Sequence, residues 1–110
     1  MEKLFSYGTL QIEQVQLDTF GRLLKGRKDV LRKYRMENLK ITDPAVIKSS
    51  GTDIHPILQY TGNERDFVEG TIFEITGDEL LRADRYEVAD YKRRKLLFES
   101  GIEAWVYLKR

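Results

Sequence analysis

The 110-residue sequence contains no cysteine, one histidine and two prolines. Without cysteine there is no disulfide, no thiolate metal ligand and no cysteine nucleophile. One histidine is too few for a histidine-based zinc site, and any catalytic serine would have to use that same histidine as its base. The sequence also has no Walker loop and no dinucleotide-binding glycine motif. We therefore expect neither a metal nor a cofactor.

The chain also lacks an excess of one charge and a long apolar run. Its 19 basic and 18 acidic residues leave a formal charge of +1, so a nucleic-acid partner is not expected. The longest apolar run is the five residues 104–108, whereas a membrane span needs about 20. The N-terminal residues do not have the charged-then-apolar order of a signal peptide. We expect a cytoplasmic protein with no membrane partner, acting as a monomer or homodimer.

What the sequence does have is enough apolar material for one core. Apolar residues make up 41% and aromatic residues 11% of the chain. A chain of this length has the size of one domain, and no repeat or linker divides it. The prediction is a single domain spanning residues 1–110.

The spacing of apolar residues predicts the elements of that domain. Strands are expected at 3–7, 30–41, 57–60, 67–75, 91–99 and 102–108, and helices at 12–24 and 76–87. Thr76 and Glu79 have the spacing of a capping box at the start of the second helix. Residues 42–51 contain turn signals around a short apolar piece. Strands and helices do not alternate, which favours an α+β fold with a small mixed, barrel-like sheet and two or more helices.

The last two predicted strands form the clearest hairpin. If Ser100 and Gly101 are a two-residue loop, Arg94 faces Tyr107 across the hairpin. The basic cluster 92–95 lies in one of these strands, and a second basic cluster lies at 32–35. Alternate strand residues point to opposite faces, so neither cluster presents all its charges together.

Two short segments could carry chemistry. In Tyr7-Gly8-Thr9-Leu10, a strand ends at a glycine just before a helical pattern. Successive amides there can point at one anion, although the same pattern occurs in an ordinary strand-to-helix turn.

The second segment is the end of the predicted helix 76–87. If Glu87 is partly buried there, its pKa would rise and suit it to acid/base work near neutral pH. The alternatives are a solvated glutamate or a partner of Arg85, Arg93 or Arg94.

Together these segments resemble the γ-glutamylcyclotransferase-like family, also called AIG2-like. The resemblance runs from Leu4 to about Leu108. It is carried by Leu4-Phe5-Ser6-Tyr7-Gly8-Thr9-Leu10-Gln11, Val68-Glu69-Gly70-Thr71-Ile72-Phe73-Glu74-Ile75, Leu80-Leu81-Arg82-Ala83-Asp84-Arg85-Tyr86-Glu87, Tyr91-Lys92-Arg93 and Ala104-Trp105-Val106-Tyr107.

The resemblance implies a small α+β fold with a cavity and assigns roles to residues of this chain. Glu87 corresponds to the catalytic acid/base, and the loop of Tyr7, Gly8, Thr9 and Leu10 binds the substrate's glutamyl head through backbone amides. Tyr91 lies near the cavity, and the loop 55–56 borders it. Relatives often have glycine after the catalytic glutamate, where this chain has Val88.

The implied reaction is a cyclotransferase reaction, of the transferase or lyase type, on a small-molecule γ-glutamyl substrate. The substrate's own α-amine attacks its γ-carbonyl, which releases 5-oxoproline and a free amine without a cofactor. Tyr7 and Tyr91 hydroxyls would orient the head group or the carboxylate, and Arg93 would be structural. Two alternatives remain: a non-catalytic small-molecule binding module on the same fold, and an interaction protein that uses the hairpin around Trp105.

Overall fold

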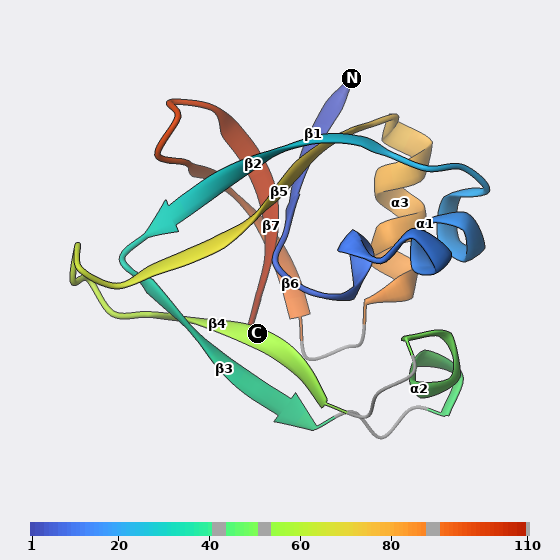
Figure 1. Ribbon diagram of the computed structural model, residues 1–110, viewed down its shortest axis with the longest axis horizontal. Helices are drawn as coiled ribbons and strands as arrows, with labels where there is room; N and C mark the ends of the chain where they lie inside the picture. The colour runs from blue at the N-terminus through green and yellow to red at the C-terminus, as the bar shows by residue number, and fades with distance from the viewer. Residues whose placement is uncertain (41–43, 51–53, 88–90, 110) are drawn as a thin grey trace.

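The computed structural model describes residues 1–40, 44–50, 54–87 and 91–109, and its helices gather on one side of a curved sheet (Figure 1). The strands are β1 (Glu2–Ser6), β2 (Lys25–Arg32), β3 (Tyr34–Lys40), β4 (Ile54–Tyr60), β5 (Phe67–Ile75), β6 (Tyr91–Leu97) and β7 (Glu103–Lys109). The helices are the 3-10 helix η1 (Thr9–Gln11), α1 (Glu13–Phe20), α2 (Pro44–Ser50) and α3 (Gly77–Tyr86). The fold is α+β, as predicted.

The main sheet has five strands in the order β2-β5-β1-β7-β6. Strand β1 is its centre, antiparallel to β5 and parallel to β7. Leu4 and Phe5 are both buried on β1 because the sheet is covered on both faces. The end of β1 therefore leads directly into η1 from the middle of the molecule.

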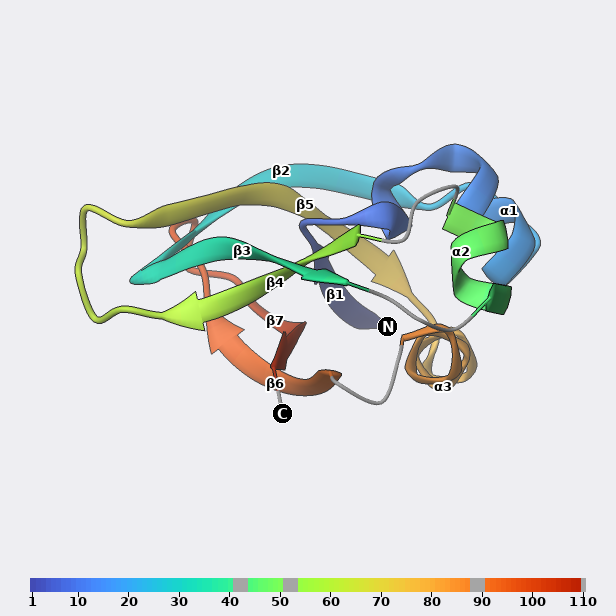
Figure 2. The ribbon, with the colours of Figure 1, turned by 90° about the horizontal axis from the view of Figure 1, so that it is seen from below.

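The predicted strand 30–41 is in fact two strands that meet at Lys33. Lys33 has a φ of 73°, so the chain turns a corner there between β2 and β3. Its amide donates to the carbonyl of Asp66, and its carbonyl accepts from the amide of Thr61. Strands β3 and β4 form a separate two-stranded sheet that folds over the main one and gives the sheet its barrel-like form (Figure 2).

The β6–β7 hairpin is present, but the predicted register was wrong by one residue. Leu97 faces Glu103, and Arg93 rather than Arg94 faces Tyr107. The loop has three residues instead of two, with Gly101 at a φ of 90° and its amide donating to the carbonyl of Phe98. The extra loop residue places Arg93 on the face of the hairpin that carries Tyr107.

Two helices were predicted within a few residues of their positions, and one was missed. Helix α1 ends where Gly21 takes a left-handed φ of 74°, earlier than the predicted end at residue 24. Helix α3 begins at the predicted capping box, with both the Thr76 and the Glu79 hydrogen bonds in place. Helix α2 lies within the segment 42–51, for which the sequence showed only turn signals around a short apolar piece.

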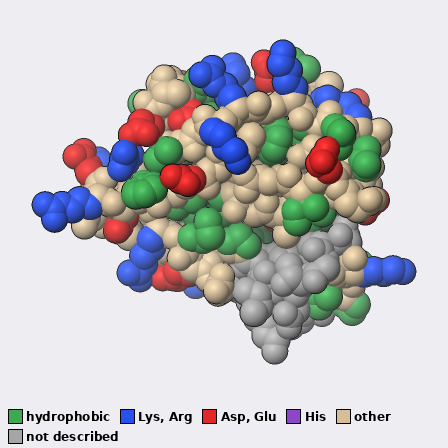
Figure 3. Space-filling model, viewed as in Figure 1, with side chains coloured by type: hydrophobic (Ala, Val, Ile, Leu, Met, Phe, Trp, Pro, Cys, Tyr) green, Lys and Arg blue, Asp and Glu red, His purple; other side chains and the backbone are tan. Residues whose placement is uncertain are grey.

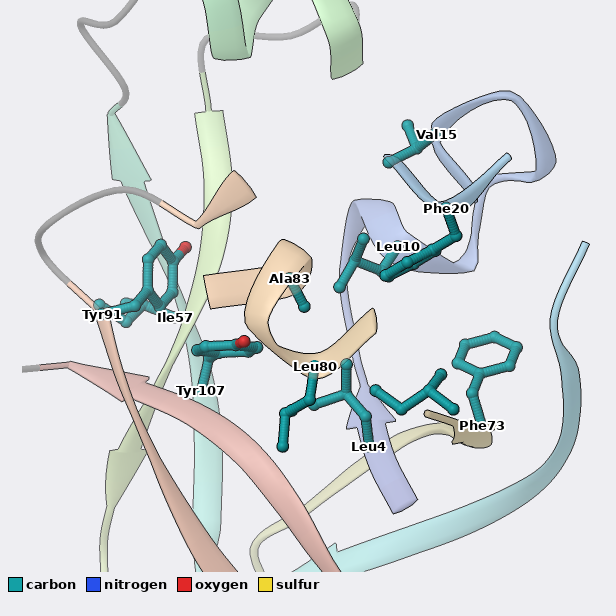
Figure 4. Close-up of a cluster of buried hydrophobic side chains, with 11 residues drawn as sticks. Leu4, Leu10, Val15, Phe20, Ile57, Phe73, Leu80, Ala83, Tyr91 and Tyr107 are labelled. Carbon is teal, nitrogen blue, oxygen red and sulfur yellow. The ribbon is translucent and has the colours of Figure 1, made fainter. Parts of the chain in front are cut away.

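Two buried clusters lie on opposite faces of the main sheet. The cluster on the helix side includes Leu4, Leu80 and Ala83 and ends at Tyr91 and Tyr107 (Figure 4). The other cluster, which includes Phe5 and Leu58, fills the space on the β3–β4 side. Within the described ranges, no helix is long and apolar enough to cross a membrane.

Candidate functional site

A pocket lies where the end of β1, the end of α3 and strands β4, β6 and β7 meet. All six residues predicted for the site line it, namely Tyr7, Gly8, Thr9, Leu10, Glu87 and Tyr91. Four further residues complete the lining: Phe5, Ser6, Pro56 and Tyr107. The fold therefore brings together two segments that are almost 80 residues apart in the sequence.

The pocket is small and partly open to solvent. The volume that the centre of a water-sized group can occupy is about 20 Å³, which is enough for one such group. The empty volume, with open solvent included, is about 330 Å³. The pocket can therefore hold one small group while the rest of a ligand extends into solvent.

The loop after β1 lines this space, and some of its amides take no part in the described secondary-structure hydrogen bonds. Thr9 and Leu10 begin η1, and among the described residues their amides have no hydrogen-bond partner. The Gly8 amide has only a long contact, 3.4 Å, with Ser6 Oγ. A Cβ at Gly8 would lie 3.2 Å from Cγ of Pro56, so a side chain there would be tight against the lining. Glycine keeps this loop close to β4.

Glu87 is the residue that ends α3. Its amide still donates to the carbonyl of Ala83, 3.0 Å away, but its ψ of 142° directs the chain out of the helix. Burial of the carboxyl group, together with the negative charge of Asp84, raises the pKa of Glu87 to about 8. The group is therefore mostly protonated at neutral pH and can ionise within the physiological range.

Asp84, one turn earlier on α3, is held in its ionised form, in contrast to Glu87. Burial tends to raise its pKa, but hydrogen bonds from Arg93 and Tyr107 together hold the pKa below its usual value. Arg93 donates to both carboxylate oxygens, at 2.7 and 3.1 Å, and the Tyr107 hydroxyl donates at 2.7 Å. Arg93 is thus structural, as predicted, and its partner is Asp84 rather than Glu87.

Two tyrosine hydroxyls of the lining donate to main-chain carbonyls. Tyr7 donates to the carbonyl of Tyr107 at 2.5 Å, and Tyr91 donates to that of Pro56 at 2.7 Å. Burial raises the pKa of Tyr7, and neighbouring Tyr91 and Glu87 raise it further, so this phenol stays protonated. Because the Tyr7 hydroxyl proton is used in the hydrogen bond to Tyr107, the Tyr7 oxygen can act in the pocket only as a hydrogen-bond acceptor. Such an acceptor can bind a cationic group of a ligand but not a carboxylate.

A hydrogen bond that the sequence did not reveal connects the two halves of the site. The hydroxyls of Thr9 and Tyr86 are 2.7 Å apart, which ties η1 to the last turn of α3. Asp84 and Tyr107 were not predicted as site residues. Both belong to sequence segments that carry the family resemblance, and these segments could have indicated that the two residues lie near the site. Pro56 was expected in a bordering loop, but it lies in β4. Val88 lies outside the described residues.

No group of three or more metal-ligating side chains occurs among residues 1–40, 44–50, 54–87 and 91–109. The pocket instead has unpartnered amides on one side and a neutral, ionisable carboxyl group on the other. This arrangement fits a small polar ligand that carries both an anionic and a cationic group.

These features define a small α+β protein with a barrel-like sheet and an acid-containing pocket at the end of its central strand. The chain belongs to the AIG2-like gamma-glutamyl cyclotransferase family, whose model matches residues 4–110. No curated protein matches the sequence.

Solved structures share the fold. Two solution structures of Arabidopsis thaliana proteins are each 18% identical to this chain, with TM-scores of 0.73 and 0.71. Each covers 98% of this chain, which spans 61% of the first protein and 68% of the second. A crystal structure of an uncharacterized Pyrococcus horikoshii protein has 14% identity and a TM-score of 0.65, covering 99% of this chain and 78% of its own. At these identities the likeness concerns the fold.

Proposed function

We propose that this protein is a cyclotransferase that converts a γ-glutamyl amine or amide into 5-oxoproline and a free amine. The single observation that carries the proposal is the convergence of Glu87 with the loop 7–10 in one pocket. Membership of the AIG2-like family supports the reaction class. The substrate's α-carboxylate would bind the amides of Thr9 and Leu10, and its α-ammonium group would lie against Tyr7 and Glu87.

The pocket has the chemistry that an ammonium group requires. Its lining includes Tyr7, whose oxygen can accept a hydrogen bond, and Glu87, which can become a carboxylate. A bound cation favours the ionised form of Glu87, because an opposite charge nearby lowers a carboxyl pKa. Binding of the substrate would thus create the base that the reaction needs.

The reaction then needs one residue that passes protons. Ionised Glu87 takes a proton from the α-ammonium, and the resulting amine attacks the γ-carbonyl carbon to close a five-membered ring. Protonated Glu87 gives its proton to the departing nitrogen as the carbon–nitrogen bond breaks. The attacking nitrogen loses two protons overall and the leaving nitrogen gains two, so no proton is supplied from outside. Holding the two ends together can contribute about 7–11 kcal/mol.

A substrate screen tests this function. The protein is incubated with a panel of γ-glutamyl amino acids and γ-glutamyl-ε-lysine, and 5-oxoproline is measured by mass spectrometry. We expect product with at least one compound and a loss of roughly 10²–10⁴-fold in rate for Glu87→Gln. Calorimetric binding without product, equal in the wild type and Glu87→Gln, would instead identify a non-catalytic binding module. Glu103→Gln, at an exposed position on β7, is the matched control.

A further inference from the structure

A second hollow lies away from the pocket, between the β3–β4 sheet and the face of the β6–β7 hairpin that carries Leu108. It measures about 310 Å³, within the range of small-molecule sites. Its base includes Leu58 and Leu108, which are both buried. Tyr34 and Tyr60 line it from β3 and β4, with ring centroids 5.3 Å apart in an edge-to-face arrangement. We call this hollow the basic groove.

The groove gathers cations from two strands. Lys92 and Arg94 line it from β6, and Lys109 lines it from the end of β7. Alternation along β6 sends Arg93 and Lys95 to the other face, where both lie over the ring of Trp105. The basic cluster 92–95 is thus divided between two faces, as the sequence suggested. Lys109 adds a third basic residue to Lys92 and Arg94 in the lining of the groove.

The groove cations differ from four arginines elsewhere in the described part of the protein, which pair with carboxylates. Arg22, Arg32, Arg35 and Arg93 each form an ion pair with a carboxylate. No such pair involves the groove cations within the part of the chain that the structure describes, and no acidic side chain is among the described residues of the lining. By contrast, acidic and basic side chains are interspersed on the face seen in Figure 3.

Arg94 lies near a polar group of the groove wall. Burial raises the pKa of Tyr34, and the positive charge of Arg94 acts against that rise, as expected for a guanidinium close to the hydroxyl. A guanidinium, two ammonium groups and a phenol supply hydrogen-bond donors and positive charge around one hollow. Arginine matches phosphate geometry with two parallel donors, and lysine adds a point charge. The exposed ring of Tyr60, 61% accessible, offers a surface for a flat group.

We propose that the basic groove binds a small organic phosphate, with the phosphate held by Lys92 and Arg94 and an attached ring placed against Tyr60. This site is separate from the pocket of Glu87 and does not rest on the proposed function. The nearly neutral chain has no general attraction for polyanions, so a small ligand fits better than a nucleic acid.

Titration of the full chain with nucleotides, followed by NMR and calorimetry, tests the groove. We expect saturable shifts at Lys92, Arg94 and Tyr60 with ATP, weaker binding of AMP, no binding of adenosine, and a loss of affinity as salt is raised. The double variant Lys92→Ala/Arg94→Ala should bind ATP at least tenfold more weakly. All these positions are exposed, so the fold should survive, which the amide spectrum of each variant checks.

The control double variant is Lys28→Ala/Lys95→Ala, which removes the same net charge from other faces and should bind ATP as the wild type does. Equal losses in the two double variants would show general charge attraction and overturn the proposal. So would the absence of any shift with ATP or inorganic phosphate. Binding of a single-stranded oligonucleotide without binding of ATP would overturn it in favour of a nucleic-acid surface. None of these outcomes depends on whether the protein forms 5-oxoproline.

Discussion

The hydroxyl groups of Thr9 and Tyr86 lie 2.7 Å apart and join the loop after the central strand to the residue that precedes Glu87. Through this contact the amide-bearing side of the pocket and its acidic side hold each other in place. The contact is partly buried, so little water competes for it. The distance between the proposed anion and proton-transfer sites therefore depends on two side chains that need not touch the ligand.

A double-mutant cycle measures this coupling. Thr9→Val and Tyr86→Phe each remove one hydroxyl, and the double variant should lose less stability than the sum of the two single losses. We expect a coupling free energy of about 0.5–3 kcal/mol in chemical unfolding. Fully additive losses would contradict a direct interaction between the two groups.

Glu87→Gln should make the protein more stable above neutral pH. The folded pKa of Glu87 is about 8 against an ordinary value of 4.5, so the folded state increasingly resists ionisation as the pH rises between these values. Each pH unit in this window costs the wild type about 1.4 kcal/mol, and glutamine avoids that cost. Thermal melts at pH 5 and pH 8 should show an advantage for Glu87→Gln that is larger at pH 8. An advantage that is equal at both pH values would contradict burial of this carboxyl group.

The pH dependence of turnover should follow Glu87 and respond to Asp84. For the proposed reaction, kcat/KM should rise with pH through a midpoint near 8, because the free enzyme needs ionised Glu87. Asp84→Asn removes a nearby negative charge and should move this midpoint downwards.

Glu79→Gln is the matched control for Asp84→Asn, because it also breaks an arginine–carboxylate pair on α3. It should leave the midpoint in place. Glu87 can also be followed directly by carbon-13 NMR of its carboxyl group, which needs no turnover. An unchanged titration in Asp84→Asn would show that Asp84 has only a structural role.

The capping box of α3 should dominate acid sensitivity at that end of the molecule. A hydrogen bond from Arg22, together with hydrogen bonds from Thr76, lowers the pKa of Glu79 to about 2. The stability that this carboxylate supplies is present above its ordinary pKa and is lost as the pH falls towards 2. Glu79→Gln should therefore destabilise the protein at pH 7 much more than at pH 2.

Thr76→Ala removes the other half of the capping box and should cost about 1 kcal/mol at neutral pH. Chemical unfolding of the single variants measures both effects. If Thr76→Ala were as stable as the wild type, the hydrogen bonds of the capping box would contribute nothing to the free energy of unfolding.

Local patterns were sufficient for much of this molecule. The alternation of residues 67–75, the capping box at Thr76 and the glycine after Tyr7 each act over a few residues, and the structure has the corresponding strand, helix start and loop. Local patterns failed where one residue changes the geometry, as at Lys33, whose left-handed φ divides a strand, and in the hairpin loop, where one additional residue shifts the register.

The convergence of Glu87 with the amides after Tyr7 could not come from any local pattern. It requires β1 and β7 to run side by side and Arg93 to lie opposite Tyr107. Asp84 takes both of these residues as partners, and no cation among the described residues pairs with Glu87. The raised pKa of Glu87 has the same origin, because burial and neighbouring charge exist only when distant segments pack together. Residue types and short spacings were enough to predict which residues belong to the site. Long-range packing determined the distances between these residues, their protonation and the pocket that they line.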